Sequence, residues 1–461
     1  MSIDLAFVVP HPPLIIPEVG KGEQRKIQQT IDAMDQAARM IASICPETII
    51  VVSPHSVMYG DYIHISPGKS AEGNFSRFGA PEVSVNKQYD TELVATLCEE
   101  AENAGISAGT LGQKDKQLDH GTMIPLYFID QHYSDYNIVR IGISGLSALD
   151  HYRFGICIRH AVERLGRRAV LVASGDLSHK LTTDGPYGFA KEGPAFDAKL
   201  TETLKAGDFM SLLRLDEAFT EAAAECGLRS FIEMAGVLDG RAVECELLSY
   251  QGPFGVGYAV GAFTATGNDD TRRFAELYKS EELQRLADIQ LGEDAYVKLA
   301  RKSLENYIRT GKALECPKTL PAEMVDRKAG VFVSLKKHGR LRGCIGTISA
   351  TEPSIANEII RNAVSAGTGD PRFDPVTAEE LPELVYSVDI LGDAEPISTM
   401  DELDPIRYGV IVSLGYRRGL LLPNLEGVDT PQQQVSIALQ KAGIQTDEKY
   451  TLERFEVIRH K

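Results

Sequence analysis

The sequence predicts an α/β fold, with an N-terminal α/β domain built on a largely parallel central sheet and a C-terminal α+β domain. Over the first part of the chain, short β-branched runs alternate with helical patterns, which is typical of parallel sheets. Two β-hairpin signals follow in the last third of the chain. The polar, turn-rich stretch TGNDDTRR at residues 266–273 separates these two parts. We therefore predict domains at residues 1–266 and 280–461.

The N-terminal elements follow from hydrophobic periodicity. The run IIVV at residues 49–52 is continuously β-branched, as expected of a strand that is buried on both faces. Apolar residues recur at steps of three and four from Ile27 to Ile41, and this spacing predicts a helix. By the same reasoning we predict strands at 3–9, 48–52, 136–144, 168–176 and 255–265, and helices at 22–44, 90–104, 151–165 and 220–238.

The C-terminal elements begin with two helical patterns within residues 271–310. Turn signals between short apolar runs then predict two hairpins. The Thr-Pro pair at the start of a later apolar pattern predicts the beginning of a helix. The hairpins pair residues 331–335 with 341–348 and residues 408–414 with 419–424, and the last helix covers 430–444.

Composition excludes several classes of function. A length of 461 residues is too great for one ordinary core. The net charge of −17 argues against nucleic acid or a membrane surface as a partner. No apolar run reaches the roughly 18 residues of a spanning helix, and prolines interrupt the apolar N-terminus, which makes it a poor signal peptide. None of the seven cysteines forms a C-x-x-C pair, which argues against a zinc knuckle or a thioredoxin-like site. An odd number of cysteines spread over a long chain indicates reduced thiols. We expect a cytoplasmic homo-oligomer that acts on a small molecule.

Histidines follow the ends of several predicted strands. His11 and His55 each come directly after a proline at a strand end, His179 follows the strand at 168–176, and His120 precedes an apolar run. Loops at the carboxyl ends of parallel strands converge, and a proline stiffens the loop that aims a histidine ring. The pattern therefore predicts a metal site. The alternative is that each histidine only stabilises its own loop by hydrogen bonds.

Two imidazoles and one carboxylate form the facial triad that holds Fe(II) and leaves positions open for substrate and O₂. The helical segment at 220–238 offers Glu221, Glu225 and Glu233 as the carboxylate. For Asp119 and Asp176, which neighbour the histidines, a turn or helix cap and a role in orienting a histidine remain equally open.

The order of these motifs resembles a known family. Pro-His, Ser-Pro-His, Asp-His-Gly, Ser-Gly-Asp-Leu-Ser-His and Glu-Cys-Gly follow one another over residues 3–265. This order resembles the class III extradiol ring-cleavage dioxygenases, of the protocatechuate-type B subunit, and their relatives, the Memo proteins. The resemblance implies that His11, His55 and Glu225 bind iron, that His179 is the catalytic acid–base group, and that His120 holds substrate or the oxygen intermediate.

The resemblance leaves the third metal ligand open, because Memo-type relatives place a cysteine near that position and Cys226 follows Glu225 directly. A thiolate favours copper or zinc over iron. If the protein is an enzyme, the resemblance implies an Fe(II) oxidoreductase that incorporates O₂ into a small catecholic compound. The alternatives are a non-oxygenase metal-binding protein in a modification pathway, and a scaffold with a relict metal site.

The C-terminal part resembles the AMMECR domain over residues 285–461, in the stretches LRGCIGTI (341–348), GTGDPRFDPV (367–376), LPELVYSVDIL (381–391) and RRGLLLPNLE (417–426). The resemblance implies a place in the AmmeMemoRadiSam grouping, with a radical-SAM protein as partner. Within the first stretch, Arg342 and Cys344 predict either a small anion or partner site with a reactive thiol, or a hairpin whose cysteine is a small core residue.

Overall fold

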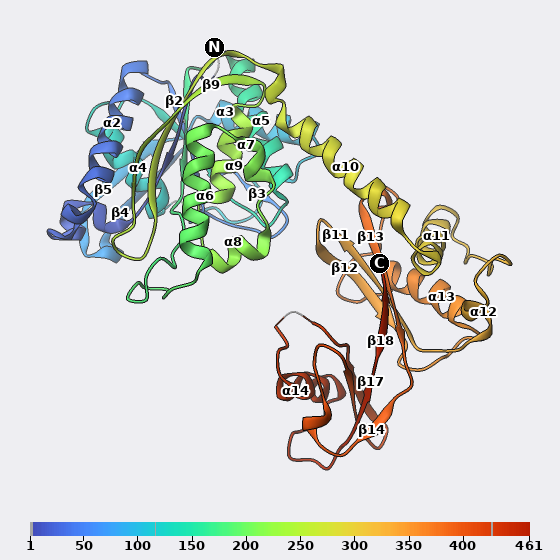
Figure 1. Cartoon of the computed structure of the whole chain (residues 1–461). Coiled ribbons are helices and arrows are strands. Elements are labelled where there is room, and N and C mark those ends of the chain that lie inside the picture. The colour runs from blue at the N-terminus through green and yellow to red at the C-terminus, as the bar shows by residue number, and fades with distance from the viewer. Residues whose placement is uncertain (1–2, 116, 426) are drawn as a thin grey trace. The chain divides into compact units, whose positions relative to one another are not determined.

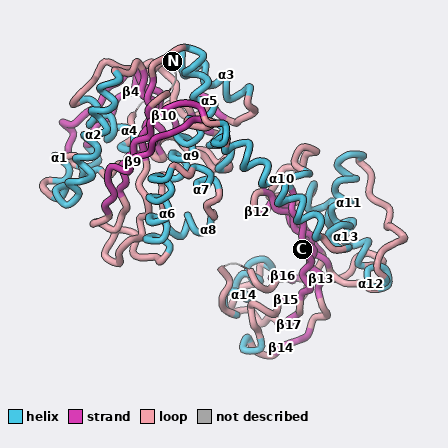
Figure 2. Tube along the Cα trace, turned by 45° about the horizontal axis from the view of Figure 1, so that its top comes forward, coloured by secondary structure: helices cyan, strands magenta, loops and turns pink. Residues whose placement is uncertain are grey.

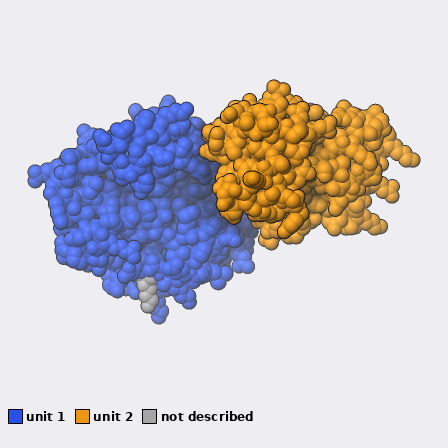
Figure 3. Space-filling model, turned by 90° about the horizontal axis from the view of Figure 1, so that it is seen from below, with its two compact units in different colours: residues 1–280 blue, residues 281–461 orange. Residues whose placement is uncertain are grey.

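The computed structural model describes residues 3–115, 117–425 and 427–461. The chain forms two compact units, residues 1–280 and 281–461, which Figure 3 colours separately. The division falls inside helix α10 (Phe274–Gly292), just after the polar stretch at 266–273. Within the described residues, no helix is long and apolar enough to cross a membrane.

Unit 1 is built on a six-stranded sheet with the order β7-β2-β8-β1-β10-β9. Figure 1 labels β2 and β9 of this sheet among the helices of unit 1. Strands β7, β2, β8 and β1 run parallel to one another. Strand β10 pairs antiparallel with β1, and the edge strand β9 pairs antiparallel with β10. The predicted, largely parallel sheet is therefore confirmed. The strands of the sheet are β1 (Leu5–Val9), β2 (Thr48–Ser53), β7 (Asn137–Gly142), β8 (Ala169–Ser174), β9 (Arg241–Gln251) and β10 (Tyr258–Asn268).

Helices cover both faces of this sheet, and Figure 2 shows them in cyan around the magenta strands. One face packs mainly against α2 and α4, and the other packs against α3, α5 and α9, so that β1, β2 and β8 are buried on both sides. The helices are α1 (Pro17–Gly20), α2 (Gln28–Ile44), α3 (Thr91–Asn103), α4 (His120–Asp130), α5 (Ala148–Leu165), α6 (Glu192–Ala206), α7 (Phe209–Leu213), α8 (Glu217–Ala223) and α9 (Leu228–Val237).

Unit 1 differs from the sequence prediction in several places, and α6 and β9 are among the elements that were not predicted. The helix predicted at 220–238 is two helices, α8 and α9, because Ala224 adopts a left-handed backbone with φ of 52° and ends the first helix. A polar hairpin, β4 (Ser70–Phe75) and β5 (Ala80–Gln88), was not predicted, since its outward residues hide the apolar alternation. Two short strands, β3 (Ile63–His64) and β6 (Ala108–Gly109), pair with each other nearby.

Unit 2 contains two antiparallel four-stranded sheets, as an α+β domain should. Both predicted hairpins are confirmed, as β11–β12 and β15–β16. Helices α11 and α13 pack on the first sheet, and α14 packs on the second. The first sheet holds β11 (Val331–Lys337), β12 (Arg340–Gly346), β13 (Leu384–Leu391) and β18 (Val457–His460); the second holds β14 (Glu395–Ile397), β15 (Gly409–Leu414), β16 (Arg417–Leu421) and β17 (Thr451–Phe455); the helices are α11 (Ala295–Thr310), α12 (Ala322–Asp326), α13 (Ile355–Thr368) and α14 (Pro431–Ala442).

Candidate metal centre

Three of the predicted histidines follow the carboxyl ends of three neighbouring parallel strands. His11 follows β1, His55 follows β2, and His179 follows β8, which lies between the other two strands. His120 is the first residue of α4, which begins at the same edge. The histidine rings lie close together at this point. The centroids of His55 and His120 are 4.2 Å apart, and those of His11 and His55 are 4.7 Å apart.

A group of three ligand atoms lies inside this cluster. In the described part of the chain, His11, His55 and Cys226 are the group of side chains that could hold a metal ion, because their ligand atoms all lie within 4.8 Å of one another. Nε2 of His11 is 3.0 Å from Nε2 of His55 and 3.6 Å from Sγ of Cys226. With nitrogen at about 2.1 Å and sulfur at about 2.3 Å from one ion, two nitrogens lie about 3.0 Å apart at a right angle and about 3.4 Å apart at the tetrahedral angle, and nitrogen and sulfur lie about 3.6 Å apart at the tetrahedral angle. These three side chains therefore fit one metal ion.

Glu225, the carboxylate implied by the resemblance, is not in that group. Glu225 and Cys226 lie in the break between α8 and α9, and Oε2 of Glu225 accepts the backbone N–H of Leu228 at 2.6 Å. The carboxylate thus caps the first turn of α9, while the neighbouring thiol reaches the histidines. Burial raises the pKa of Glu225 to about 7 and the pKa of the Cys226 thiol well above its usual value.

The other two glutamates of the segment lie elsewhere. Glu221 is exposed on α8. Glu233 is fully buried on α9, where its Oε1 is 2.7 Å from Nδ1 of the equally buried His151. Neither belongs to the group around His11.

His120 and His179 lie beside the ligand group with neutral rings. Burial, and then the neighbouring His55, lower the pKa of His120 to about 4. The same two causes lower the pKa of His179. The ring of His120 packs edge-on against Phe78, and that of His179 stacks on Tyr187 at 5.0 Å. Both aromatic neighbours come from loops, where no periodic signal in the sequence marked them.

Asp119 is a helix cap that also holds the loop of His55, and Asp176 holds the loop of His11 through the backbone of that residue. Asp119 caps α4 through the N–H of Thr122, and its Oδ1 also accepts the hydroxyl hydrogen of Ser53, the last residue of β2, at 2.6 Å. Asp176 accepts the backbone N–H of His11 at 2.9 Å, and burial raises its pKa to about 7. Each carboxylate therefore holds a loop that carries a histidine.

A buried arginine, which the sequence analysis missed, fixes the segment before His120. Arg140 on β7 is 1% exposed. It donates to the hydroxyl of Ser66 and to the carbonyl oxygens of Asp115 and Gln117, at 2.6 to 2.7 Å. Its guanidinium group thus connects the sheet to the chain that leads into α4. Its position inside a strand gave no indication of this role.

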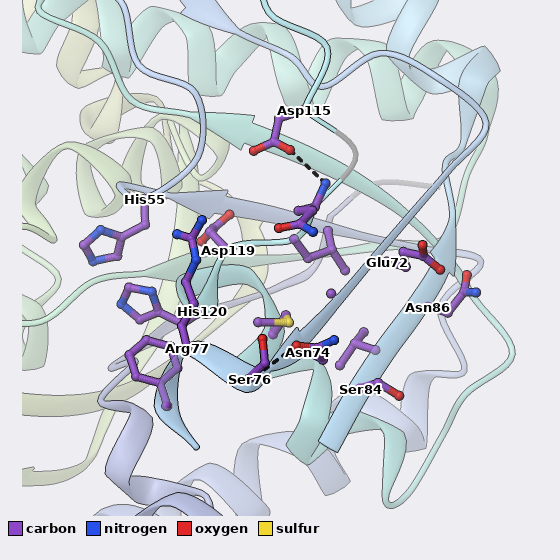
Figure 4. Close-up of a pocket in the computed structure, with 16 residues that line it drawn as sticks. His55, Glu72, Asn74, Ser76, Arg77, Ser84, Asn86, Asp115, Asp119 and His120 are labelled. Carbon is purple, nitrogen blue, oxygen red and sulfur yellow. Dashed lines mark hydrogen bonds between the residues drawn. The ribbon is translucent and has the colours of Figure 1, made fainter. Parts of the chain in front are cut away.

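A cavity of about 650 Å³ opens onto the cluster. His55 and His120 lie at one end of it, and the β4–β5 hairpin forms the other end, as Figure 4 shows. Phe78 and Arg77 line it from the short turn between the hairpin strands. The rest of the lining is mainly polar, from Glu72, Asn74, Ser76, Ser84, Asn86, Asp115, Gln117 and Asp119. The cavity can hold a small polar molecule whose one end reaches the histidine rings.

In unit 2, Arg342 is engaged within the fold. Its Nε and Nη2 donate to the carboxylate of Glu380, both at 2.9 Å, and its Nη1 donates to the carbonyl oxygen of Asp374. This bidentate pair neutralises the charge of Arg342, so the fork predicted for an external anion binds a neighbouring loop of the chain instead.

Cys344 also serves the hairpin. Its backbone N–H donates to Oδ2 of Asp370 at 2.8 Å, and its half-buried sulfur receives the hydroxyl of Ser334 at 3.2 Å. Asp370 in turn pairs with Arg372. These contacts fit the reading of Cys344 as a packed hairpin residue.

Comparisons with known proteins agree with this architecture. Residues 5–261 match the family model of the catalytic LigB subunit of aromatic ring-opening dioxygenase, and residues 297–460 match that of AMMECR1. A protein of Clostridium acetobutylicum is 45% identical over 474 aligned residues, covering 100% of both chains. A protein of Thermotoga maritima is 51% identical over 37% of this chain and 99% of its own. A crystal structure of an uncharacterized protein from Pyrococcus horikoshii is 33% identical, covers 36% of this chain and 88% of its own, and has a TM-score of 0.34.

The match to the LigB model spans more than half of the 461 residues, and the relative from Clostridium acetobutylicum aligns over the full length of both chains. The chain therefore belongs to the family of the catalytic LigB subunit of aromatic ring-opening dioxygenases, joined in this protein to a C-terminal AMMECR1 domain.

Proposed function

We propose that unit 1 is a metal-dependent dioxygenase that opens a small hydroxylated aromatic ring, such as a catechol, with Fe(II) held by His11, His55 and Cys226. The observation that carries the proposal is the convergence of these three ligand atoms within 4.8 Å, with one of the three residues, His55, lining a cavity of about 650 Å³. Membership of the LigB family supports iron as the metal and an aromatic compound as the substrate.

Bound iron would supply a Lewis acid at which the ring hydroxyls and O₂ meet. The chain would do the rest. The neutral ring of His179 has a nitrogen lone pair that accepts a proton from a substrate hydroxyl and later returns it. His120 and Phe78, whose rings pack edge-on with centroids 5.4 Å apart, would form a wall of the cavity against which the substrate ring lies. The polar residues of the β4–β5 hairpin would orient the far end of the substrate by hydrogen bonds.

Metal analysis tests the ligand set. We expect the purified protein to contain close to one metal ion per chain, and His11→Ala and His55→Ala to contain almost none. His160→Ala is the matched control, since His160 is exposed on α5, away from the cluster. Equal metal in all four proteins would contradict the site.

Ring opening tests the reaction. The Fe(II)-loaded protein, mixed with a panel of catechols and O₂, should form yellow ring-opened products with matching O₂ consumption. His179→Gln should bind the same catechols but turn them over at least about 100-fold more slowly, the usual effect of losing an acid–base group. A panel without any turnover by the wild type would contradict the dioxygenase reaction and leave the metal site standing.

One observation favours a second candidate function. A cysteine stands where the triad would place a carboxylate, and thiolate ligands favour copper or zinc. On this candidate, unit 1 is a non-oxygenase metal-binding protein that works with a radical-SAM partner in a modification pathway, or a scaffold with a relict site. Tighter binding of zinc or copper than of iron, together with no O₂ consumption, would select it.

A further inference from the structure

Ser174, the last residue of β8, lies directly behind His11. It is completely buried, with its hydroxyl 2.9 Å from Nδ1 of His11 and 2.6 Å from the carbonyl oxygen of Gly121. A serine hydroxyl has a single hydrogen to donate, and a carbonyl oxygen can only accept. The hydrogen of Ser174 therefore goes to Gly121, and the hydroxyl meets His11 with a lone pair. Nδ1 of His11 must then carry the hydrogen of that contact.

The sequence explains why the carbonyl oxygen of Gly121 can accept the hydrogen of Ser174. Gly121 lies in the first turn of α4, where its carbonyl would normally accept the N–H of the residue four positions later. That residue is Pro125, which has no N–H and whose ring crowds the same carbonyl. A buried acceptor without its helical donor needs another donor, and Ser174 supplies it.

Gly121 also allows the close approach that this arrangement needs. A Cβ atom at Gly121 would lie 2.5 Å from Oγ of Ser53 and 3.4 Å from Nδ1 of His11. Only a residue without a side chain lets the first turn of α4 pack this closely against the ends of β1, β2 and β8.

We infer that Ser174, with Pro125 behind it, is a positioning residue that holds His11 in the tautomer with hydrogen on Nδ1. The Nε2 lone pair of His11 then faces Nε2 of His55 and Sγ of Cys226, at 3.0 and 3.6 Å. The opposite tautomer would place a hydrogen where a metal must bind. The role of this arrangement in metal binding rests on the proposed function. The tautomer of His11 is a property of the metal-free chain and can be measured without metal.

The test reads the tautomer by NMR on the full-length, metal-free protein with ¹⁵N-labelled histidine. Long-range ¹H–¹⁵N spectra distinguish a ring nitrogen that carries hydrogen from one that does not, and His11→Gln assigns the signals. We expect Nδ1 of His11 to carry the hydrogen in the wild type. In Ser174→Ala we expect the Nε2–H form to appear, and Ser174→Thr should restore the wild-type pattern. A wild type with hydrogen on Nε2, or an unchanged pattern in Ser174→Ala, would overturn the inference.

Two further variants separate this role from a merely structural one. Ser303→Ala removes a hydroxyl that is just as buried and also donates to a backbone carbonyl, that of Ile360, and it should leave His11 unchanged. Pro125→Ala gives the carbonyl of Gly121 its helical N–H back, so the Nε2–H form should appear there too, to a smaller extent. No change in Pro125→Ala would overturn the role of Pro125. If Ser174→Ala does not fold, Pro125→Ala also tests Ser174, and an unchanged His11 in that variant would overturn the inference.

Zn²⁺ titration gives the consequence for binding. We expect Ser174→Ala to bind Zn²⁺ about 10- to 100-fold more weakly than the wild type, the usual effect of losing a partner that orients a ligand histidine. Ser174→Thr and Ser303→Ala should bind like the wild type. Unchanged affinity in Ser174→Ala would overturn the positioning role. A wild type that shows the expected tautomer but binds no metal would instead refute the proposed function.

Discussion

Nε2 of His11 and Nε2 of His55 face each other at 3.0 Å, although the two residues follow strands that are separated in the sheet by β8. Two histidines from different loops meet nitrogen to nitrogen where a third side chain, Cys226, also arrives. At this meeting point we expect one metal ion to bind.

The first prediction concerns the choice between the two neighbouring candidate ligands. Cys226→Ser should weaken Zn²⁺ binding by at least about tenfold, because a hydroxyl is a much poorer ligand than a thiolate. Glu225→Gln should keep the metal affinity of the wild type and lose only about 1 kcal/mol of stability from the weakened cap on Leu228. Competition titrations against a coloured chelator measure the affinities. A reversed pattern would restore Glu225 as the ligand.

The second prediction concerns Gly121. Gly121→Ala should weaken metal binding by at least about tenfold, because the new Cβ atom would push α4 away from Ser53 and shift the histidines. Gly267→Ala is the matched control, since a Cβ atom there meets no atom within 4 Å. Both variants should be titrated with Zn²⁺ side by side. Equal affinities would show that the close packing of α4 does not shape the site.

The third prediction concerns Arg140. Arg140→Ala should lower the free energy of unfolding by about 3 kcal/mol or more, because it removes three hydrogen bonds from a fully buried guanidinium group. Amide hydrogen exchange should increase first in residues 117–119, which lead into α4. Arg164→Ala, at an exposed position on α5, should change stability by less than about 0.5 kcal/mol. Unaltered exchange before α4 would contradict the anchoring role of Arg140.

The fourth prediction concerns the buried pair of His151 and Glu233, both 0% exposed. Glu233→Ala should cost about 3 to 5 kcal/mol, because it leaves a buried imidazole without its partner. The remaining folded protein should still bind metal like the wild type, since Glu233 lies outside the ligand group. Urea unfolding and metal analysis on the same sample separate the two effects. A loss of metal with no loss of stability would make Glu233 a ligand after all.

The fifth prediction is a pH dependence in unit 2. Hydrogen bonds from Arg372 and from the N–H of Cys344 lower the pKa of Asp370 below its ordinary value. A carboxylate with a lowered pKa in the folded state adds stability above its unfolded pKa of about 3.9, and this contribution is lost as the pH falls below that value. The gap in Tm between wild type and Asp370→Asn should therefore be widest near neutral pH and should narrow towards pH 3. A gap that widens in acid would contradict the sign.

The sequence predicted the sheet of unit 1 well, because the run at 49–52 and its parallel neighbours must be apolar on both faces. It missed β9 and the β4–β5 hairpin, whose strands are half exposed and mix polar with apolar residues. It also joined α8 and α9 into one helix, because the apolar spacing continues through the break and the left-handed turn at Ala224 leaves no signal in residue type.

The histidines of the site could be predicted because each follows a strand end or begins a helix at the edge where parallel strands end. The candidate for the third ligand could not be predicted, since Glu225 and Cys226 are adjacent, and which of them faces His11 depends on the backbone between α8 and α9. Ser174 and Arg140 lie inside or at the end of strands and act through hydrogen bonds to residues distant in sequence, which no local pattern records.

X-ray absorption at the metal edge tests whether His11, His55 and Cys226 hold the metal. The sample is the full-length protein loaded with one equivalent of Fe(II) or Zn²⁺. We expect nitrogen scatterers at about 2.1 Å from His11 and His55 and one sulfur scatterer at about 2.3 Å, which disappears in Cys226→Ser. A first shell with no sulfur in the wild type, or one that keeps its nitrogen scatterers in the double variant His11→Ala/His55→Ala, would contradict this expectation.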